Sequence, residues 1–375
     1  MSTIRFEQET DGSFYRVAKQ RVNDLFSRTG KSRLANSSIL WKAAFYFVVL
    51  VGSYTLVLLH PFPNWTLLPL AFVYGLTALL LVVNVGHEAA HETLFRSKFW
   101  NNVILALSFA PIGLSGYLWK MRHTKSHHLF PNVNGCDSDI DENPFLRLSP
   151  NHAWRPHFRY QHLYAPLIYL IVGVHSLLWQ EFGYLFKKQL ANMTDIKHPP
   201  RQYLVFALTK AFHFSAALVV PLLVLPLPWW QIVLGYLAMT CVGSLAFVAL
   251  LGPSHYSDLA EFPVVSTDGR IGHTWSIHNL VTTCDWSPYS PIALFISGGF
   301  NTHASHHLFP KISHAHYPAI ARIVEDTASE CGVRYNRKSA LGAIGSHFRF
   351  LRNMGRKPES FRTGCIDAQL PSHLP

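Results

Sequence analysis

Three clusters of histidines are the residues of this chain whose types and spacing could do chemistry. They read HEAAH at 87–91, HTKSHH at 123–128 and HASHH at 303–307, in a chain of 375 residues with 22 histidines. Side chains four residues apart lie on one face of a helix, so each cluster can direct two imidazoles to one point. Imidazole binds iron, copper and zinc alike, so the spacing predicts metal binding without naming the metal.

The number of these histidines indicates two metal ions with about four nitrogen ligands each. The clusters supply eight imidazoles, which is too many for one tetrahedral zinc ion. The pairs expected to share a metal are His87 with His91, His123 with His127, and His303 with His307. His128 and His306 lie on neighbouring helix faces, so we expect them to reach a second metal a few ångströms away.

The first cluster also matches the HExxH pattern of zinc metalloproteases. In that hypothesis His87 and His91 bind zinc and Glu88 is the catalytic base. It leaves the other two clusters unexplained, so a membrane zinc protease stays a distant alternative. A metal-binding membrane protein without catalytic activity is weaker still.

Two long uncharged segments separate and precede the clusters. No Asp, Glu, Lys or Arg occurs between Lys42 and Glu88, or between Lys210 and Asp258. Each segment is about twice the roughly 20 residues that span a bilayer, and a Pro- and Trp-containing break divides it in the middle. The pattern predicts two transmembrane hairpins, with spans at about 43–60 and 66–86, and at about 205–225 and 230–251.

The distribution of positive charge predicts the orientation of these hairpins. The net charge is +11, and the basic residues lie outside the apolar runs. The positive-inside rule therefore places the N-terminus, residues 87–200 and the C-terminal part in the cytoplasm. An even number of spans must separate the second and third clusters, so we expect the apolar segment 163–179 to lie along the membrane interface. The bilayer is the expected partner of the basic face, and no nucleic-acid signature is found.

The order of the clusters, with a hydrophobic hairpin before the third, resembles the membrane fatty acid desaturase and hydroxylase superfamily. The similarity extends to CDSDID at 136–141, LRLSP at 146–150 and YQHLYAPLIYL at 160–170. The stretch GGFNTHASHHLFPKISHAHYPAIARIVEDTASECGVRY is similar to the C-terminal box of front-end acyl-lipid and linoleoyl-CoA-type desaturases. The resemblance covers about residues 30–350.

This resemblance implies a di-iron site held by the cluster histidines. The implied ligands are His87, His91, His123, His127, His128, His303, His306 and His307. The family places one more ligand between the last span and the third cluster, where His255 in GPSHYSDLAEFP stands and His278 is the rival. Ligand histidines also need partners for their other ring nitrogen. Glu88, Asp285 and His278 are candidates for that role or for the metal itself, and Glu92 is a further candidate partner.

The chain departs from the family pattern in ways that bear on its assignment. Front-end enzymes commonly have Gln where this chain has His303, and relatives often have Asp where it has Glu88. Many eukaryotic front-end enzymes carry a fused cytochrome b5 domain with an HPGG motif, to which His198-Pro199-Pro200 is the nearest string here. We therefore expect electrons from a separate ferredoxin, or from cytochrome b5 with its reductase.

The implied fold is an all-α integral membrane protein with four transmembrane helices in two hairpins. A cytosolic helical cap would hold the histidine-rich di-iron site. We expect a cytosolic N-terminal segment at 1–40, a desaturase domain at 41–350 and a loose C-terminal tail at 351–375. The protein is thus expected to be a multi-pass membrane protein with both termini and all three clusters on the cytoplasmic side.

The implied function is an oxygen-dependent desaturase that introduces a C=C bond into an acyl chain carried by CoA or by a lipid. Removal of hydrogen from an unactivated methylene is beyond acid and base side chains and needs oxygen activated on a transition metal. The same clusters serve fatty acyl or lipid hydroxylases, and sphingolipid or natural-product acyl desaturases, so these alternatives stay open.

Overall fold

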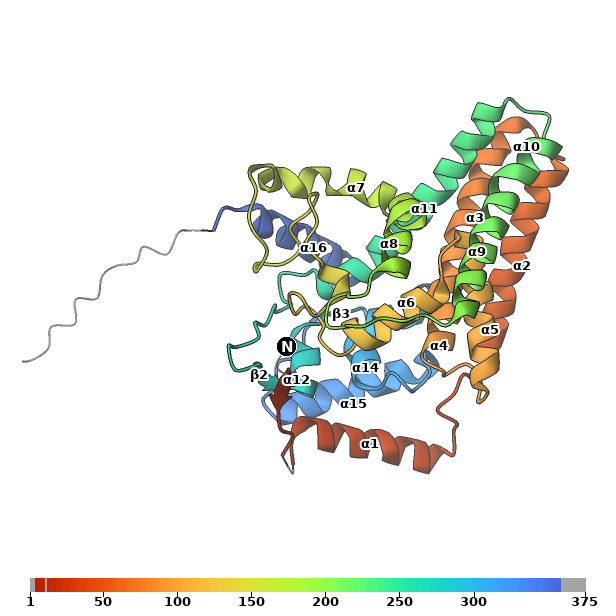
Figure 1. The fold of residues 1–375 in the computed structure, drawn as a ribbon. Helices are drawn as coiled ribbons and strands as arrows, with labels where there is room; N and C mark the ends of the chain where they lie inside the picture. Colours follow the sequence, from red (N-terminus) through yellow and green to blue (C-terminus); the bar gives the residue numbers. More distant parts are fainter. Residues whose placement is uncertain (1–3, 11, 359–375) are drawn as a thin grey trace, which may run out of the picture.

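Long helices dominate the structure, a computed structural model that describes residues 4–10 and 12–358. Figure 1 shows α2, α3, α9, α10 and α11 side by side on one side of the molecule, with shorter elements gathered beyond one end of them. The helices that form this bundle are α2 (Ser37–Leu59), α3 (Leu67–Leu81), α9 (Pro200–Phe214), α10 (Val220–Val224) and α11 (Trp229–His255). Two small parallel sheets of two strands each join the helices, so the all-α prediction holds only coarsely.

The four predicted spans each coincide with a helix that is long and apolar enough to cross a membrane. These stretches are 37–59, 64–90, 200–224 and 229–255. The second joins η1 (Asn64–Thr66), α3, the π-helix η2 (Val82–Gly86) and α4 (His87–Ala90), so it ends in the first histidine cluster. The third is continuous through the π-helix η8 (Ser215–Val219). Hydropathy over about 20 residues is a strong signal because each unpaired backbone N–H or C=O group in the bilayer core is energetically costly, so the chain crosses it as an apolar helix.

A fifth stretch, 156–186, is also long and apolar enough to span a membrane. It comprises η6 (Pro156–Tyr160), α7 (Gln161–His175), η7 (Ser176–Gln180) and α8 (Glu181–Phe186). Figure 1 shows α7 running across the direction of the bundle, and the Gly173 amide donates to Ser244 Oγ of α11 at 2.8 Å. Residues 4–10 and 12–358 thus contain five such helical stretches, or up to six if the bent pair described below is one span, where the sequence predicted four spans.

The segment between the first two clusters is a sharply bent pair of helices. It contains α5 (Lys98–Phe109), η3 (Ala110–Ile112), α6 (Gly116–Arg122) and the π-helix η4 (His123–His127), and its two arms meet at 109°. Next to the bend, Lys210 Nζ of α9 and Glu181 Oε2 of α8 form a buried ion pair at 2.8 Å. Glu181 Oε1 also accepts the Ser115 amide at 2.7 Å, which fixes the start of α6. A pair bent this sharply is either a broken span or a re-entrant segment.

The elements beyond the bundle form a cap around the second and third clusters. Their bounds are α1 (Phe14–Thr29), η5 (Ser138–Ile140), α12 (Trp275–Val281), α13 (Pro291–Ser297), η9 (Phe300–Thr302), α14 (His303–Leu308), η10 (His314–His316), α15 (Tyr317–Glu330) and α16 (Ala340–Gly355). The strands are β1 (Arg5–Glu7) with β2 (Arg270–Thr274), and β3 (Asp285–Trp286) with β4 (Arg337–Lys338). One apolar core joins α1, α12, α14 and α15, and Ile320 and Val324 are fully buried in it.

The predicted boundary of the C-terminal tail is wrong by several residues. Helix α16 continues through Leu351 to Gly355, because Phe350 and Leu351 pack with Ala165 and Tyr169 of α7. Residues 359–375 of the predicted tail lie outside the described residues.

Candidate metal centre

The histidines of the three clusters, together with His255, lie in one buried site. We call two sets of four the first and second histidine groups, because within each set one nitrogen per side chain lies within 4.8 Å of the others. The first group is His87, His91, His123 and His306, and the second group is His127, His255, His303 and His307. His128 lies between the groups and is close to both His306 and His307.

The first group joins all three clusters at their Nε2 atoms. His87 Nε2 lies 3.2 Å from both His123 Nε2 and His306 Nε2. His91 Nε2 lies 3.0 Å from His123 Nε2. Aromatic rings pack around these imidazoles: Trp119 stacks on His123 at a centroid distance of 4.3 Å, and Phe300 lies 4.5 Å from His87.

The second group joins the second and third clusters to the end of α11. His303 Nε2 lies 2.7 Å from His255 Nε2 and 3.2 Å from His307 Nε2. The His127 ring lies 4.5 Å from that of His255. His255 thus occupies the position that the family resemblance implied for the further ligand.

The pairing within the second cluster differs from the prediction. His87 stays with His91 and His303 with His307, as expected, but His123 and His127 belong to different groups. His123 and His127 are the first and last residues of a π-turn, in which the His128 amide donates to the His123 carbonyl at 2.9 Å. This turn brings His128, five residues on, next to His123. The two rings lie side by side at 5.6 Å, and His128, not His127, approaches His123 and His306 at 3.0 and 2.9 Å. Such π-turns are rare and are frequent at functional sites.

Hydrogen bonds at Nδ1 fix the tautomers of three of the four histidines in the second group. Nδ1 of His127 faces the Asp137 carboxylate at 3.0 Å, Nδ1 of His255 faces the Thr282 carbonyl at 3.1 Å, and Nδ1 of His307 faces Asn279 Oδ1 at 3.0 Å. These acceptors require a proton on Nδ1, so each neutral ring directs the lone pair of Nε2 inward.

Inward lone pairs at these distances fit a bound cation. His303 Nε2 faces the lone pairs of His255 and His307, and one proton on it could satisfy only one of them. Imidazolium is disfavoured in the third cluster, because burial lowers the pKa of His303, His306 and His307 well below its usual range. His127 differs: burial lowers its pKa, but the carboxylates of Asp137 and Asp139 outweigh that effect and raise it. Neutral imidazoles that converge in a buried site are the donor set of a transition metal.

The carboxylates proposed as partners of the ligand imidazoles lie elsewhere. Glu88 is buried and accepts hydrogen bonds from His314 Nδ1 (2.6 Å), the His314 amide (2.8 Å) and Thr93 Oγ1 (2.6 Å). Lys42 Nζ then meets His314 Nε2 at 2.9 Å. Glu88 therefore ties the first cluster to the loop after the third, and its oxygens are engaged rather than free to act as the base of a protease.

Asp285 and Glu92 likewise hold the clusters in place from outside. Asp285 accepts the Ala304 amide at the start of α14 (2.8 Å) and the Tyr335 hydroxyl (2.5 Å), and burial raises its pKa to about 7. Glu92 pairs with Lys120 at 3.0 Å and with Lys311 at 3.2 Å. Neither carboxylate contacts an imidazole of the two groups among the described residues.

His278 lies outside both histidine groups. It is fully buried beneath the N-terminal strand, with the Phe6 ring 5.2 Å from its own, and burial lowers its pKa to about 4. The structure therefore separates it from its rival His255.

Four groups that hold the imidazoles were not predicted: the side chains of Asp137, Asn279 and Tyr317, and the Thr282 carbonyl. Tyr317 Oη lies 3.2 Å from His306 Nδ1. Only Asp137 carried a signal, since it belongs to CDSDID, one of the stretches that resemble the family. The others come from segments with no metal-ligand pattern of their own.

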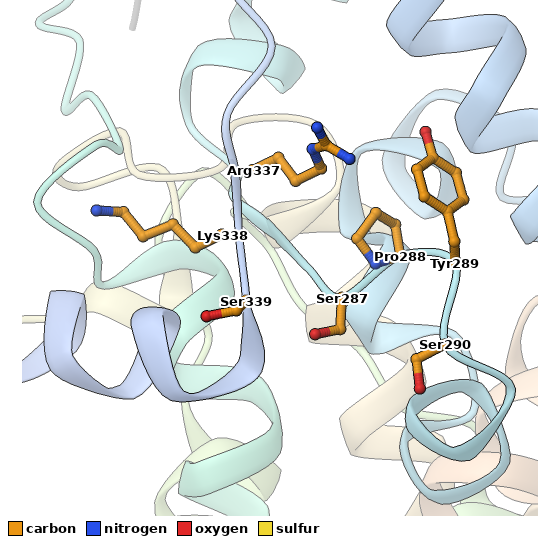
Figure 2. A pocket seen from close by; sticks show the side chains of 7 residues that line it. All are labelled: Ser287, Pro288, Tyr289, Ser290, Arg337, Lys338 and Ser339. Atoms are coloured by element: carbon orange, nitrogen blue, oxygen red, sulfur yellow. The ribbon is translucent and has the colours of Figure 1, made fainter.

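A surface pocket of about 390 Å³ lies away from the histidine groups. Figure 2 shows its lining residues, Ser287, Pro288, Tyr289, Ser290, Arg337, Lys338 and Ser339, where the chain leaves β3 and β4. It contains no member of either group. The candidate metal centre is formed by buried histidines in the core, not by this surface pocket.

Comparisons with known proteins agree with this centre. The profile described as "Fatty acid desaturase" matches residues 63–339. The chain is 29% identical to sn-1 linoleoyl-lipid 6-desaturases of Arthrospira platensis and Synechocystis sp., over 92% and 94% of its length and 94% and 98% of theirs. It is 26% identical to an acyl-lipid (8-3)-desaturase of Physcomitrium patens, over 94% of its own length and 74% of that protein. Because the profile matches most of the chain, including all three clusters, this protein belongs to the fatty acid desaturase family.

Proposed function

We propose that this desaturase acts on lipid-linked acyl chains near their carboxyl end and uses two iron ions bound by the two histidine groups. The observation that carries the proposal is the convergence of buried imidazoles from all three clusters, with Nε2 atoms 2.7 to 3.2 Å apart. The cyanobacterial relatives, which this chain matches almost end to end, are named as 6-desaturases of linoleoyl lipids. Their names support a front-end, acyl-lipid assignment over acyl-CoA.

The ligands in this proposal are the members of the two groups. His87, His91, His123 and His306 would hold one ion, and His127, His255, His303 and His307 would hold the other, with His128 available to either. Bound iron would supply the activation of dioxygen: two hydrogens would leave neighbouring methylenes, and with two electrons and two protons from the external donor system the dioxygen would be reduced to two waters.

The chain itself supplies orientation and a dry environment. Asp137, Asn279 and the Thr282 carbonyl hold Nδ1 protons, so the Nε2 lone pairs stay inward through each turnover. Trp119 and Phe300 cover the rings of the first group and keep water from that side. Hydroxylase chemistry would use the same nitrogen donors, and no contact among the described residues of the site favours it.

We place four spans in the membrane and the centre on the cytoplasmic side. Second- and third-cluster histidines share one site, so an even number of crossings separates them. The bundle helices α9–α10 and α11 make two crossings, and the transverse course of α7 supports an interfacial position for 156–186 (Figure 1). The basic residues outside the spans support the cytoplasmic side. The electron donor in this proposal is a separate ferredoxin, or cytochrome b5 with its reductase.

Mass-spectrometric profiling of a host that expresses the chain tests the activity. We expect fatty acids two mass units lighter than their precursors with the intact protein and not with His307→Ala, and fragmentation should place the new double bond near the carboxyl end. Products sixteen units heavier would identify a hydroxylase instead. A short pulse of labelled precursor separates the carriers: label should be desaturated in the polar lipid fraction first, and its first appearance in acyl-CoA would overturn the acyl-lipid assignment.

Metal analysis of the purified protein tests the cofactor independently. We expect about two iron ions per chain, because each group offers four nitrogen donors. A single zinc ion with no iron would overturn the di-iron proposal whatever the lipid profile shows.

A further inference from the structure

Helices α13 and α16 expose large apolar side chains although neither belongs to a predicted span. We call Ile292, Phe295, Ile296, Leu341, Ile344 and Phe348 the C-terminal apolar patch. Leu341 is 83% exposed and Ile292 is 71% exposed, more than most residues of the spanning helices. Apolar side chains gathered on a surface mark a contact with a partner or with lipid.

Helices α13 and α16 pack against the same apolar cluster. Ala293 of α13 and Ala343 of α16 pack in the same apolar cluster with Trp286 and the span residue Leu250. Figure 2 shows the two segments that enter these helices, 287–290 and 337–339, on either side of the surface pocket. The patch residues therefore belong to one region of the surface.

This region lies at the cytoplasmic end of the spans. The Tyr46 hydroxyl of α2 donates to the Phe295 carbonyl at 2.9 Å, and Tyr46 is one turn beyond Lys42, where the uncharged run begins. Asn84 Nδ2, just before the first histidine cluster, donates to the Ile296 carbonyl at 3.0 Å. The patch thus continues the lipid-facing surface of α2, where Phe45 is exposed and contacts Phe295.

The pattern along α16 is that of a helix lying in a membrane interface. Leu341, Ile344 and Phe348 follow i, i+3, i+7 spacing and share one side. Exposed Arg352 follows Phe348 by four residues and so borders this side near the end of the helix. Arg349 lies next to it and pairs with Asp258 at 2.6 Å, while the third side packs on the protein. An apolar side next to a basic side suits the boundary between acyl chains and anionic headgroups.

We propose that α13 and α16 insert the C-terminal apolar patch into the cytoplasmic leaflet of an anionic phospholipid bilayer. This inference rests on the proposed topology. Such insertion would also fix the position of the third cluster. Two residues separate the end of α13 from η9, and η9 leads directly into His303. Seating α13 in the leaflet holds the third cluster at the level where lipid-linked acyl chains are found.

Spin labels on the full-length protein in vesicles of phosphatidylcholine and phosphatidylglycerol test the proposal. Leu341→Cys and Ile344→Cys are introduced one at a time, in a background with Cys241→Ser, Cys331→Ser and Cys365→Ser. Cys136 and Cys284 are kept because they are buried. Val48→Cys on α2 is the matched lipid-facing control, and Ser329→Cys on exposed α15 is the aqueous control. Relaxation by dissolved oxygen reports lipid contact, and relaxation by a water-soluble nickel chelate reports water contact.

We expect the labels at 341 and 344 to behave like the label at 48, with severalfold more relaxation by oxygen than by the chelate. The proposal would be overturned if the chelate relaxed the labels at 341 and 344 as much as the label at 329. It would also be overturned if both labels were shielded from both agents, because the patch would then be covered by a second protein chain and not by lipid. If the label at 48 is itself exposed to the chelate, then the proposed topology has failed rather than the patch alone.

Discussion

The two histidine groups are held in place by different interactions. In the second group, three of four imidazoles bind a fixed acceptor through Nδ1: Asp137, Thr282 or Asn279. In the first group, the one such contact among the described residues joins His306 to Tyr317. Rings of the first group instead pack against the aromatic faces of Trp119 and Phe300.

This difference suggests two ways to prepare a metal site. Hydrogen bonds at Nδ1 select the tautomer and set the direction of each lone pair before the metal arrives. Aromatic packing fixes the ring plane but leaves the tautomer to be selected by the metal itself. The second group is then the better ordered without metal, and the first group depends more on binding. The following substitutions test this contrast.

Removal of one ligand from each group should have the largest effect. We expect His87→Ala to empty the first group and His303→Ala to empty the second, because each group would retain three protein donors of four. Each single variant should lose all detectable desaturation and about half of the bound iron, and the double variant nearly all of it. Iron analysis checks this, and complete loss of iron in either single variant would show that the groups do not bind independently.

Removal of the aromatic cover should disturb the first group next. Trp119→Ala takes away the ring that stacks on His123, and the cost in folding free energy should be about 3 kcal/mol, the low end for Trp→Ala because this side chain is half-buried. Thermal unfolding of the detergent-solubilised protein measures it. Trp119→Phe keeps a ring there and should recover most of the loss; an equal loss in both variants would contradict a packing role.

Removal of the Asp137 carboxylate should weaken metal binding at the second group. In Asp137→Asn the amide oxygen can still accept from His127 Nδ1, but the NH2 group then faces the backbone N–H of Asn132 or Asp139, which should cost about 1 to 3 kcal/mol of folding free energy. Iron affinity should fall about 10- to 100-fold. Competition with a chelator measures the change. The matched change in the first group is Tyr317→Phe, for which we expect a smaller decrease; a larger decrease for Tyr317→Phe would reverse the contrast.

Substitution of Glu92 should have the smallest effect. Glu92 adopts φ +63, a left-handed conformation that Asn tolerates better, but its two partly exposed ion pairs join the first cluster to Lys120 and Lys311. In Glu92→Asn, the relief of backbone strain and the loss of the two ion pairs should nearly cancel. The free energy of unfolding should therefore stay within about 1 kcal/mol of that of the unchanged protein. Denaturation at low and high salt checks this, and strong destabilisation would mean that the pairs hold the clusters together.

Much of the architecture could be predicted because its signals are local. Hydropathy over the span length located all four bundle stretches, and helical spacing correctly grouped His87 with His91 and His303 with His307. The same rule failed for His123 and His127, because a π-turn has no distinct sequence signal and changes which side chains meet. The partners of Glu88 also could not be predicted, since His314 lies 226 residues away along the chain.

The sequence by itself determined the family, the membrane helices and the set of histidines, because a bilayer imposes a length and a metal imposes a ligand type. Only the tertiary structure decided how those histidines divide into two groups and which acceptors orient them. It also decided that 156–186, apolar enough to span, contains a helix that runs across the bundle. The physical reason is that each of these outcomes depends on contacts between separate segments, from 10 residues apart for His127 and Asp137 to 219 for His87 and His306, or on one irregular turn. Neither leaves a periodic pattern in the sequence.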